Sequence, residues 1–79
     1  MKSINIQAFY EDFKKEYTFL YDNRDNIAGF SEAVDGFDNF IKTENGKRLA
    51  SDFCKYRQDF ITSDREAAAF MFALDTITA

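Results

Sequence analysis

The feature that most constrains the fold is an unbroken apolar run, Ala67 to Leu74, inside the segment SDREAAAFMFALDTITA at residues 63–79. A surface helix shows one apolar stripe, whereas a helix that is apolar all round is buried on most of its faces. A run of eight residues is too short to cross a bilayer, so protein has to cover it. We therefore predict that this helix has neighbours on several faces, supplied by the same chain or by a second copy.

Ser63 and Glu66 form a capping-box pattern directly before this run. In a capping box the serine hydroxyl accepts a hydrogen bond from the amide three residues later, and the glutamate reaches back to the cap amide. Asp64 places negative charge at the positive end of the helix dipole. The helix is therefore predicted to start immediately after Ser63.

The composition favours an all-α fold. The 79-residue chain has ten Phe and four Tyr but only three Gly and no Pro, so helix breakers are scarce. A chain of this length is short of buried surface, and aromatic side chains, which bury about 150–250 Å² each, help to supply it. We predict a single domain over residues 1–79, either a small four-helix bundle or an orthogonal four-helix fold.

Three amphipathic helices are predicted ahead of the capped one, because apolar residues recur at spacings of three and four. The first is expected to run from a cap at Ser3 or Asn5 to about Asp22. The apolar positions are Ile6, Tyr10, Phe13, Tyr17 and Leu20 in the first helix, Ile27, Phe30, Val34, Phe37 and Ile41 in the second, and Leu49, Phe53, Tyr56 and Phe60 in the third.

Short polar turns are predicted between these helices, at residues 22–26, 43–46 and 62–63. In the second turn we expect Gly46 to take the left-handed conformation that commonly ends a helix. Connections this short make consecutive helices neighbours in space.

The sequence lacks the residues that most enzyme and metal sites use. It has no His, a single Cys at position 54, and glycines that stand apart at positions 29, 36 and 46. These counts exclude Ser–His and Cys–His nucleophile pairs, zinc sites built from thiolates and imidazoles, and glycine-rich phosphate loops. We therefore expect no catalytic activity, no metal and no other cofactor.

The lone Cys54 cannot form an internal disulfide, which favours a reducing compartment. No charged and then apolar leader is recognisable, and no apolar run reaches the length of a membrane span. We expect a cytoplasmic protein that does not act in a membrane.

The charge is distributed unevenly along the chain, whose formal net charge is −4. Residues 22–44 hold six acids and two bases, whereas residues 47–57 hold four bases and one acid. One interpretation is that the two segments pair with each other as adjacent helices, and the other is that each is a separate binding surface.

Glu32, Asp35 and Asp38 recur at every third position of the second helix, about 4.5 Å apart along its axis. Such a row of carboxylates resembles a row of phosphates and would fit the nucleic-acid groove of a partner protein. The alternative is a solvated helix face with no partner, since acids are common in a chain of this charge. We take these three residues as the candidate partner-binding surface.

Lys47, Arg48 and Lys55 are the candidate nucleic-acid contacts, because lysine and arginine neutralise phosphates. Asp52 and Asp59 interrupt this small group, and the chain as a whole is negative. Internal pairing or solvation is therefore the favoured interpretation, and nucleic acid is not the expected partner.

Phe72 is a candidate interface residue, because on a helix it points about 160° away from Phe70. Either the last helix lies in the centre of the fold, or Phe72, Ala68 and Ala69 meet a second molecule, which is another partner or, in a homodimer, a second copy of the chain. Adjacent alanines permit the close approach that either arrangement needs.

These observations predict a non-catalytic protein-binding module, a small acidic adaptor or inhibitor that occludes the surface of a protein partner. Inhibitors encoded by mobile elements and nucleic-acid mimics share this outline of size and charge, which is an analogy of composition. The alternatives are a nucleic-acid-binding regulator that uses the third helix and a homo-oligomerisation module that uses the last one.

Overall fold

A computed structural model describes residues 4–23, 27–59 and 61–78, which form helices joined by turns, with no strand among them. The four helices are α1 (Ile6–Asn23), α2 (Phe30–Phe40), α3 (Glu44–Arg57) and α4 (Asp64–Thr78). The prediction of an all-α fold is confirmed. None of these helices, within the described ranges, is both long and apolar enough to pass through a bilayer.

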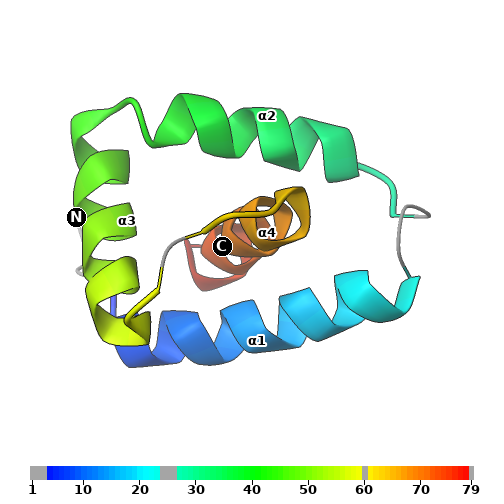
Figure 1. The fold of residues 1–79 in the computed structure, drawn as a ribbon, viewed down its shortest axis with the longest axis horizontal. Coiled ribbons are helices and arrows are strands. Elements are labelled where there is room, and N and C mark those ends of the chain that lie inside the picture. Colours follow the sequence, from blue (N-terminus) through cyan, green and yellow to red (C-terminus); the bar gives the residue numbers. More distant parts are fainter. Residues whose placement is uncertain (1–3, 24–26, 60, 79) are drawn as a thin grey trace.

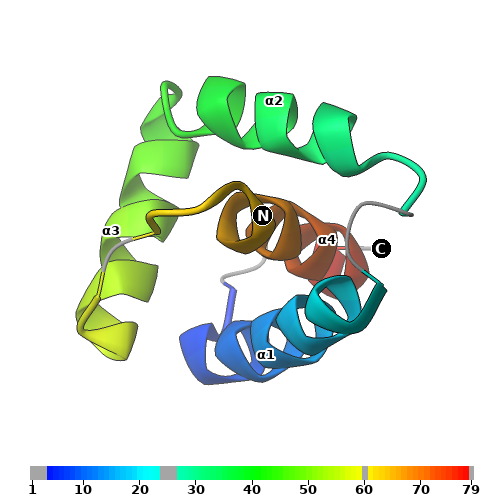
Figure 2. The ribbon, with the colours of Figure 1, turned by 45° about the vertical axis from the view of Figure 1, so that its right-hand side comes forward.

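The last helix, α4, lies at the centre. Figure 1 shows α1, α3 and α2 around three sides of α4, which is seen almost along its axis. Figure 2, turned by 45°, shows α4 between α1 and α2, with α3 spanning the neighbouring ends of those two helices. The expectation that the apolar run has neighbours on several faces is confirmed, and its own chain supplies them.

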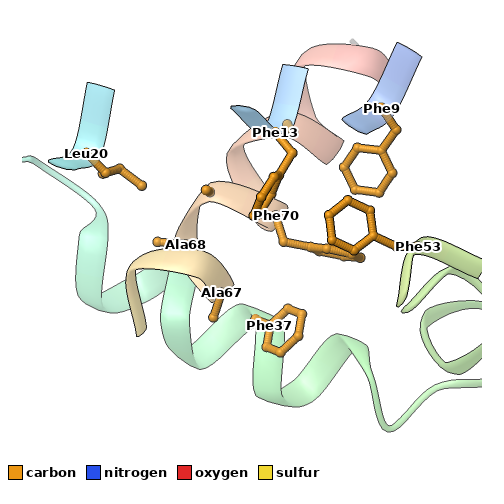
Figure 3. Packing of buried hydrophobic residues seen from close by; sticks show 10 residues of the cluster. Phe9, Phe13, Leu20, Phe37, Phe53, Ala67, Ala68 and Phe70 are labelled. Atoms are coloured by element: carbon orange, nitrogen blue, oxygen red, sulfur yellow. The ribbon is translucent and has the colours of Figure 1, made fainter. Parts of the chain in front are cut away.

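Aromatic rings from all four helices meet around Phe70 of α4 (Figure 3). Its ring centroid lies 4.9 Å from that of Phe9, 5.1 Å from that of Phe37 and 5.4 Å from that of Phe53. Full burial of one such ring stabilises the fold by about 1.5–3 kcal/mol. The remaining buried apolar residues are Phe13, Leu20, Ala67, Ala68, Ala69 and Ala73.

Two helix starts follow the predicted local chemistry. Asn5 caps α1, because its Oδ1 accepts hydrogen bonds from the amides of Gln7 at 2.9 Å and Ala8 at 3.1 Å. Ser63 caps α4, because its Oγ accepts from the amide of Glu66 at 3.2 Å. Ser3, the other proposed cap of α1, lies outside the described residues.

The prediction for Gly46 is wrong. Gly46 does not end a helix but lies buried in the first turn of α3, where its amide donates to the Oγ1 of the capping Thr43 at 3.0 Å. A Cβ at this position would stand 1.7 Å from the carbonyl oxygen of Phe40. Glycine is therefore needed here because the start of α3 packs directly on the end of α2.

The third helix is shorter than its predicted stripe. α3 ends at Arg57, and Gln58 follows in the left-handed region with φ 64°. Phe60 lies outside the described residues, and Tyr56 is 44 % exposed. Phe53 is the fully buried aromatic anchor of α3, since Leu49 is half-buried and Tyr56 is exposed.

Candidate functional site

The acidic face of α2, made by Glu32, Asp35 and Asp38, is fully on the outside of the molecule. The opposite side of the same helix carries the buried Phe37, whose ring packs on Phe70 of the core. None of the three carboxylates has an ion-pair partner within the described parts of the chain. The acidic face therefore presents its charge to solvent from a helix whose position the core holds.

The interpretation that the acidic second helix pairs with the basic third helix finds no support in the ion pairs of the described residues. Their ion pairs join Glu11 to Lys14, and Arg57 to Asp59 and Glu66, and none of them links α2 with α3. The physical reason is that the start of α3 packs on the end of α2, at Gly46 and Phe40, and the rest of α3 runs away from α2 (Figure 1).

Lys47, Arg48 and Lys55 form a basic group on α3 in which each side chain is exposed. Across residues 4–23, 27–59 and 61–78 no carboxylate pairs with them. The exposed Asp52 lies between them on the same helix, so the group is not a continuous positive surface. Lys55 also borders an open depression, lined by Ala50, Ser51, Cys54, Lys55, Gln58 and Asp59.

Two of the three candidate interface residues on α4 need a correction. Ala68 and Ala69 are fully buried within the chain, so they offer no surface to a second molecule. Their small side chains let α1 and α2 pack close to α4 instead. Phe72 is half-buried and packs against the core cluster, so it is the one member of the set that retains exposed surface.

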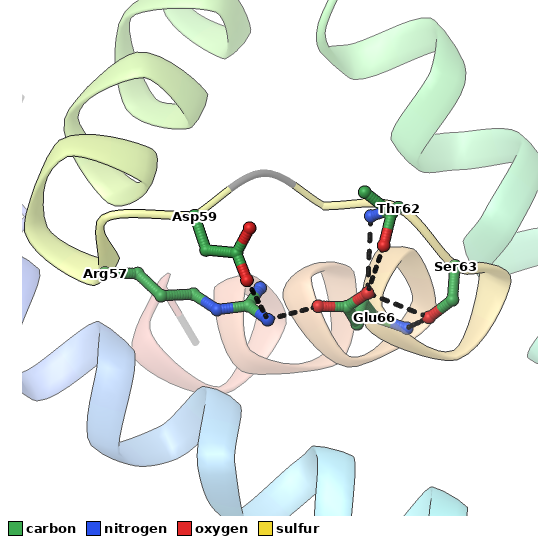
Figure 4. A network of polar contacts seen from close by, with 5 residues as sticks. All are labelled: Arg57, Asp59, Thr62, Ser63 and Glu66. Atoms are coloured by element: carbon green, nitrogen blue, oxygen red, sulfur yellow. Dashed lines mark hydrogen bonds and ion pairs between the residues drawn. The ribbon is translucent and has the colours of Figure 1, made fainter.

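A polar network that the sequence analysis missed joins the end of α3 to the start of α4 (Figure 4). Glu66 is only 7 % exposed, and its Oε2 accepts a hydrogen bond from Nη2 of Arg57. Its Oε1 accepts from Ser63 Oγ at 3.0 Å and from both the amide and the hydroxyl of Thr62 at 3.2 Å. Glu66 thus reaches back to the amide before the cap residue, in addition to the capping serine.

This network keeps Glu66 ionised inside the protein. Burial alone would raise the pKa of Glu66, but the hydrogen bonds from Arg57, Thr62 and Ser63 and the positive charge of Arg57 hold that pKa below its ordinary value of 4.5. The guanidinium of Arg57 also lies over the ring of Phe13, 5.4 Å from its centroid, and 3.9 Å from a carboxylate oxygen of Asp59.

Two facts in the sequence bear on this pair. Glu66 directly precedes the apolar run, so burial at that position was foreseeable. Its partner was not, because Arg57 stands nine positions away in a segment that has three other bases. Side chains this far apart meet only when the turn between two helices brings them together.

Among the described residues no group of three or more histidine, cysteine, aspartate or glutamate side chains is arranged to hold a metal ion. No protein-family model matches the chain, and neither curated proteins nor solved structures match it.

Proposed function

We propose that this protein is a non-catalytic binding module, an acidic adaptor or inhibitor that uses the acidic face of α2 to occupy a basic surface on a protein partner. The observation that carries the proposal is the set of three exposed carboxylates, Glu32, Asp35 and Asp38, without ion-pair partners in the described chain. Like charges at this spacing repel one another, which a basic partner surface would relieve.

The proposed mechanism is steric and electrostatic occlusion. The core holds α2 through Phe37, so the helix backbone that carries the carboxylates needs no ordering on binding. Their rise of about 4.5 Å per step along the helix suits a groove lined by lysine and arginine, such as a nucleic-acid groove. The lone Cys54 is in keeping with action in the cytoplasm.

The test is affinity capture from a lysate of the native host with the triple variant Glu32→Gln, Asp35→Asn, Asp38→Asn. A matched control neutralises three exposed acids on other helices, Asp22→Asn, Asp52→Asn and Asp75→Asn, and so changes the net charge equally. We expect the wild type and the control to capture the same partner and the α2 variant to lose it.

Titration of the captured complex with duplex DNA then identifies the occupied surface. Release of the partner by DNA indicates that the acidic face fills a nucleic-acid groove. The proposal is contradicted if both triple variants retain the partner. It is also contradicted if both lose the partner equally, because the net charge of the protein would then be enough to explain binding.

A second candidate function is binding of nucleic acid through α3. The exposed Lys47, Arg48 and Lys55, which lack ion-pair partners in the described residues, favour it. It predicts a salt-dependent affinity for duplex DNA that Lys47→Glu and Arg48→Glu abolish. Absence of binding at low salt would remove this candidate.

A further inference from the structure

The third helix is attached to the central helix through side chains alone. No Cα atom of α3 comes within 8 Å of a Cα atom of α4 in the described structure, whereas both α1 and α2 approach α4 that closely. The contacts between α3 and α4 include the Phe53 and Phe70 rings, 5.4 Å apart, and the bond from Arg57 to Glu66. α3 also packs on α1, where Phe53 meets the rings of Phe9 and Phe13. Gly46 and Phe53 are the buried residues of α3.

The Arg57–Glu66 link is the polar part of this attachment, and it is incompletely satisfied. Nη1 of Arg57 is buried and, within the described chain, has no hydrogen-bond partner. A buried donor without an acceptor costs free energy that water would return on exposure. Opening of α3 would allow water to accept a hydrogen bond from this Nη1.

The ends of α3 are suited to hinge motion. On one side Gln58 is the C-cap of α3 in the left-handed region, φ 64°, which is unfavourable for a residue with a side chain, and its amide donates to the carbonyl oxygen of Cys54. On the other side a short turn between α2 and α3 leads to the Thr43 cap. None of the described residues in these two turns is fully buried, although Ile41 and Ile61 are half-buried and pack against the core cluster.

We propose that α3 opens away from the core as a unit while α1, α2 and α4 stay folded, and that the bond between Arg57 and Glu66 is the latch that holds it closed. Opening withdraws Phe53 from the rings of Phe9, Phe13 and Phe70 and uncovers that side of the aromatic cluster. The inference is independent of the acidic face, since it concerns another helix.

The first test uses the wild-type protein, by native-state hydrogen exchange at increasing denaturant below the unfolding transition. Amides of α3 from residue 48 onward are expected to exchange with little dependence on denaturant, since opening one helix exposes little surface. For amides in the middle of α1 and α4, the exchange rate is expected to depend on denaturant concentration as strongly as global unfolding does. If α3 exchanges with the same dependence as α1 and α4, the proposal is wrong.

The second test uses Glu66→Gln, which keeps a side chain able to cap the helix but removes its charge, and Arg57→Met, which keeps an apolar cover over Phe13. Each is expected to speed exchange in α3 by about tenfold or more relative to α1 and α4. Arg48→Met is the control, an exposed arginine on the same helix, and should leave the pattern unchanged. Equal acceleration in all helices would show that the bond is only a global stabiliser.

Discussion

The helices α4 and α3 are nearly equal in length, at 15 and 14 residues, yet they are held in place in different ways. α4 buries Glu66, Ala67, Ala68, Ala69, Phe70 and Ala73 and touches the core along most of its length. α3 buries Gly46 and Phe53, and the rest of it is polar or half-buried. A helix that is apolar all round is held in place by the large apolar area that it buries. A more polar helix depends on a few specific contacts.

The substitution Phe70→Ala in α4 is expected to have the largest effect on the free energy of unfolding. Phe70 contacts rings from the other three helices, so its loss leaves a cavity at the centre of the molecule. We expect a loss of about 3–5 kcal/mol of unfolding free energy, measured by urea denaturation followed by circular dichroism. A loss below about 1 kcal/mol would contradict the central position of this ring.

The next largest effect is expected from a substitution at the contact between α3 and α2. Gly46→Ala places a methyl group 1.7 Å from the Phe40 carbonyl oxygen, so the start of α3 has to shift. We expect a loss of about 1–3 kcal/mol in the same denaturation experiment.

The matched control for that substitution is Gly36→Ala in α2. A Cβ there would lie in ordinary contact, 3.9 Å from Cε of Met71. Alanine is the better helix former, so we expect this variant to be more stable than the wild type by about 0.5–1 kcal/mol. Equal losses at the two glycines would show that the close approach at Gly46 is not the cause.

A smaller effect depends on pH. Because the pKa of Glu66 is lowered in the folded protein, its ionised form stabilises the fold at pH values above its ordinary pKa of 4.5. That contribution is lost as the pH falls through the lowered folded value. We expect wild type to exceed Glu66→Gln in unfolding free energy by about 1–2 kcal/mol at pH 7, and the gap to close as the pH falls further below 4.5.

Denaturation of both proteins from pH 7 to pH 3 measures this gap. A difference that stays constant over the whole range would mean that the charge of Glu66 does not contribute, and that only its shape and hydrogen bonds matter.

The smallest expected effect on stability is at the acidic face. The triple variant Glu32→Gln, Asp35→Asn, Asp38→Asn should gain a few tenths of a kcal/mol, because it removes repulsion between exposed carboxylates. Salt should shrink the gain by screening. A clear loss of stability would reveal that these side chains support the fold and would weaken their assignment to a partner.

The candidate site was only partly predictable from the sequence. Periodicity placed Glu32, Asp35 and Asp38 opposite the apolar positions of the second helix, and the structure exposes all three. The uneven distribution of charge allowed the interpretation that acids of the second helix meet bases of the third. That interpretation finds no support in the described residues, because charge content does not determine the distance between two helices.

The sequence by itself determined the helical class, the cap at Ser63 and the need of the apolar run for covering neighbours, and it offered Asn5 as one of two caps for the first helix. These features depend on the residues of a single helix. Only the tertiary structure decided that Gly46 packs on Phe40, that Arg57 reaches Glu66, and that Ala68 and Ala69 face their own chain. These contacts depend on how helices are placed relative to one another. That placement results from packing all four apolar faces at once, and no single segment encodes it.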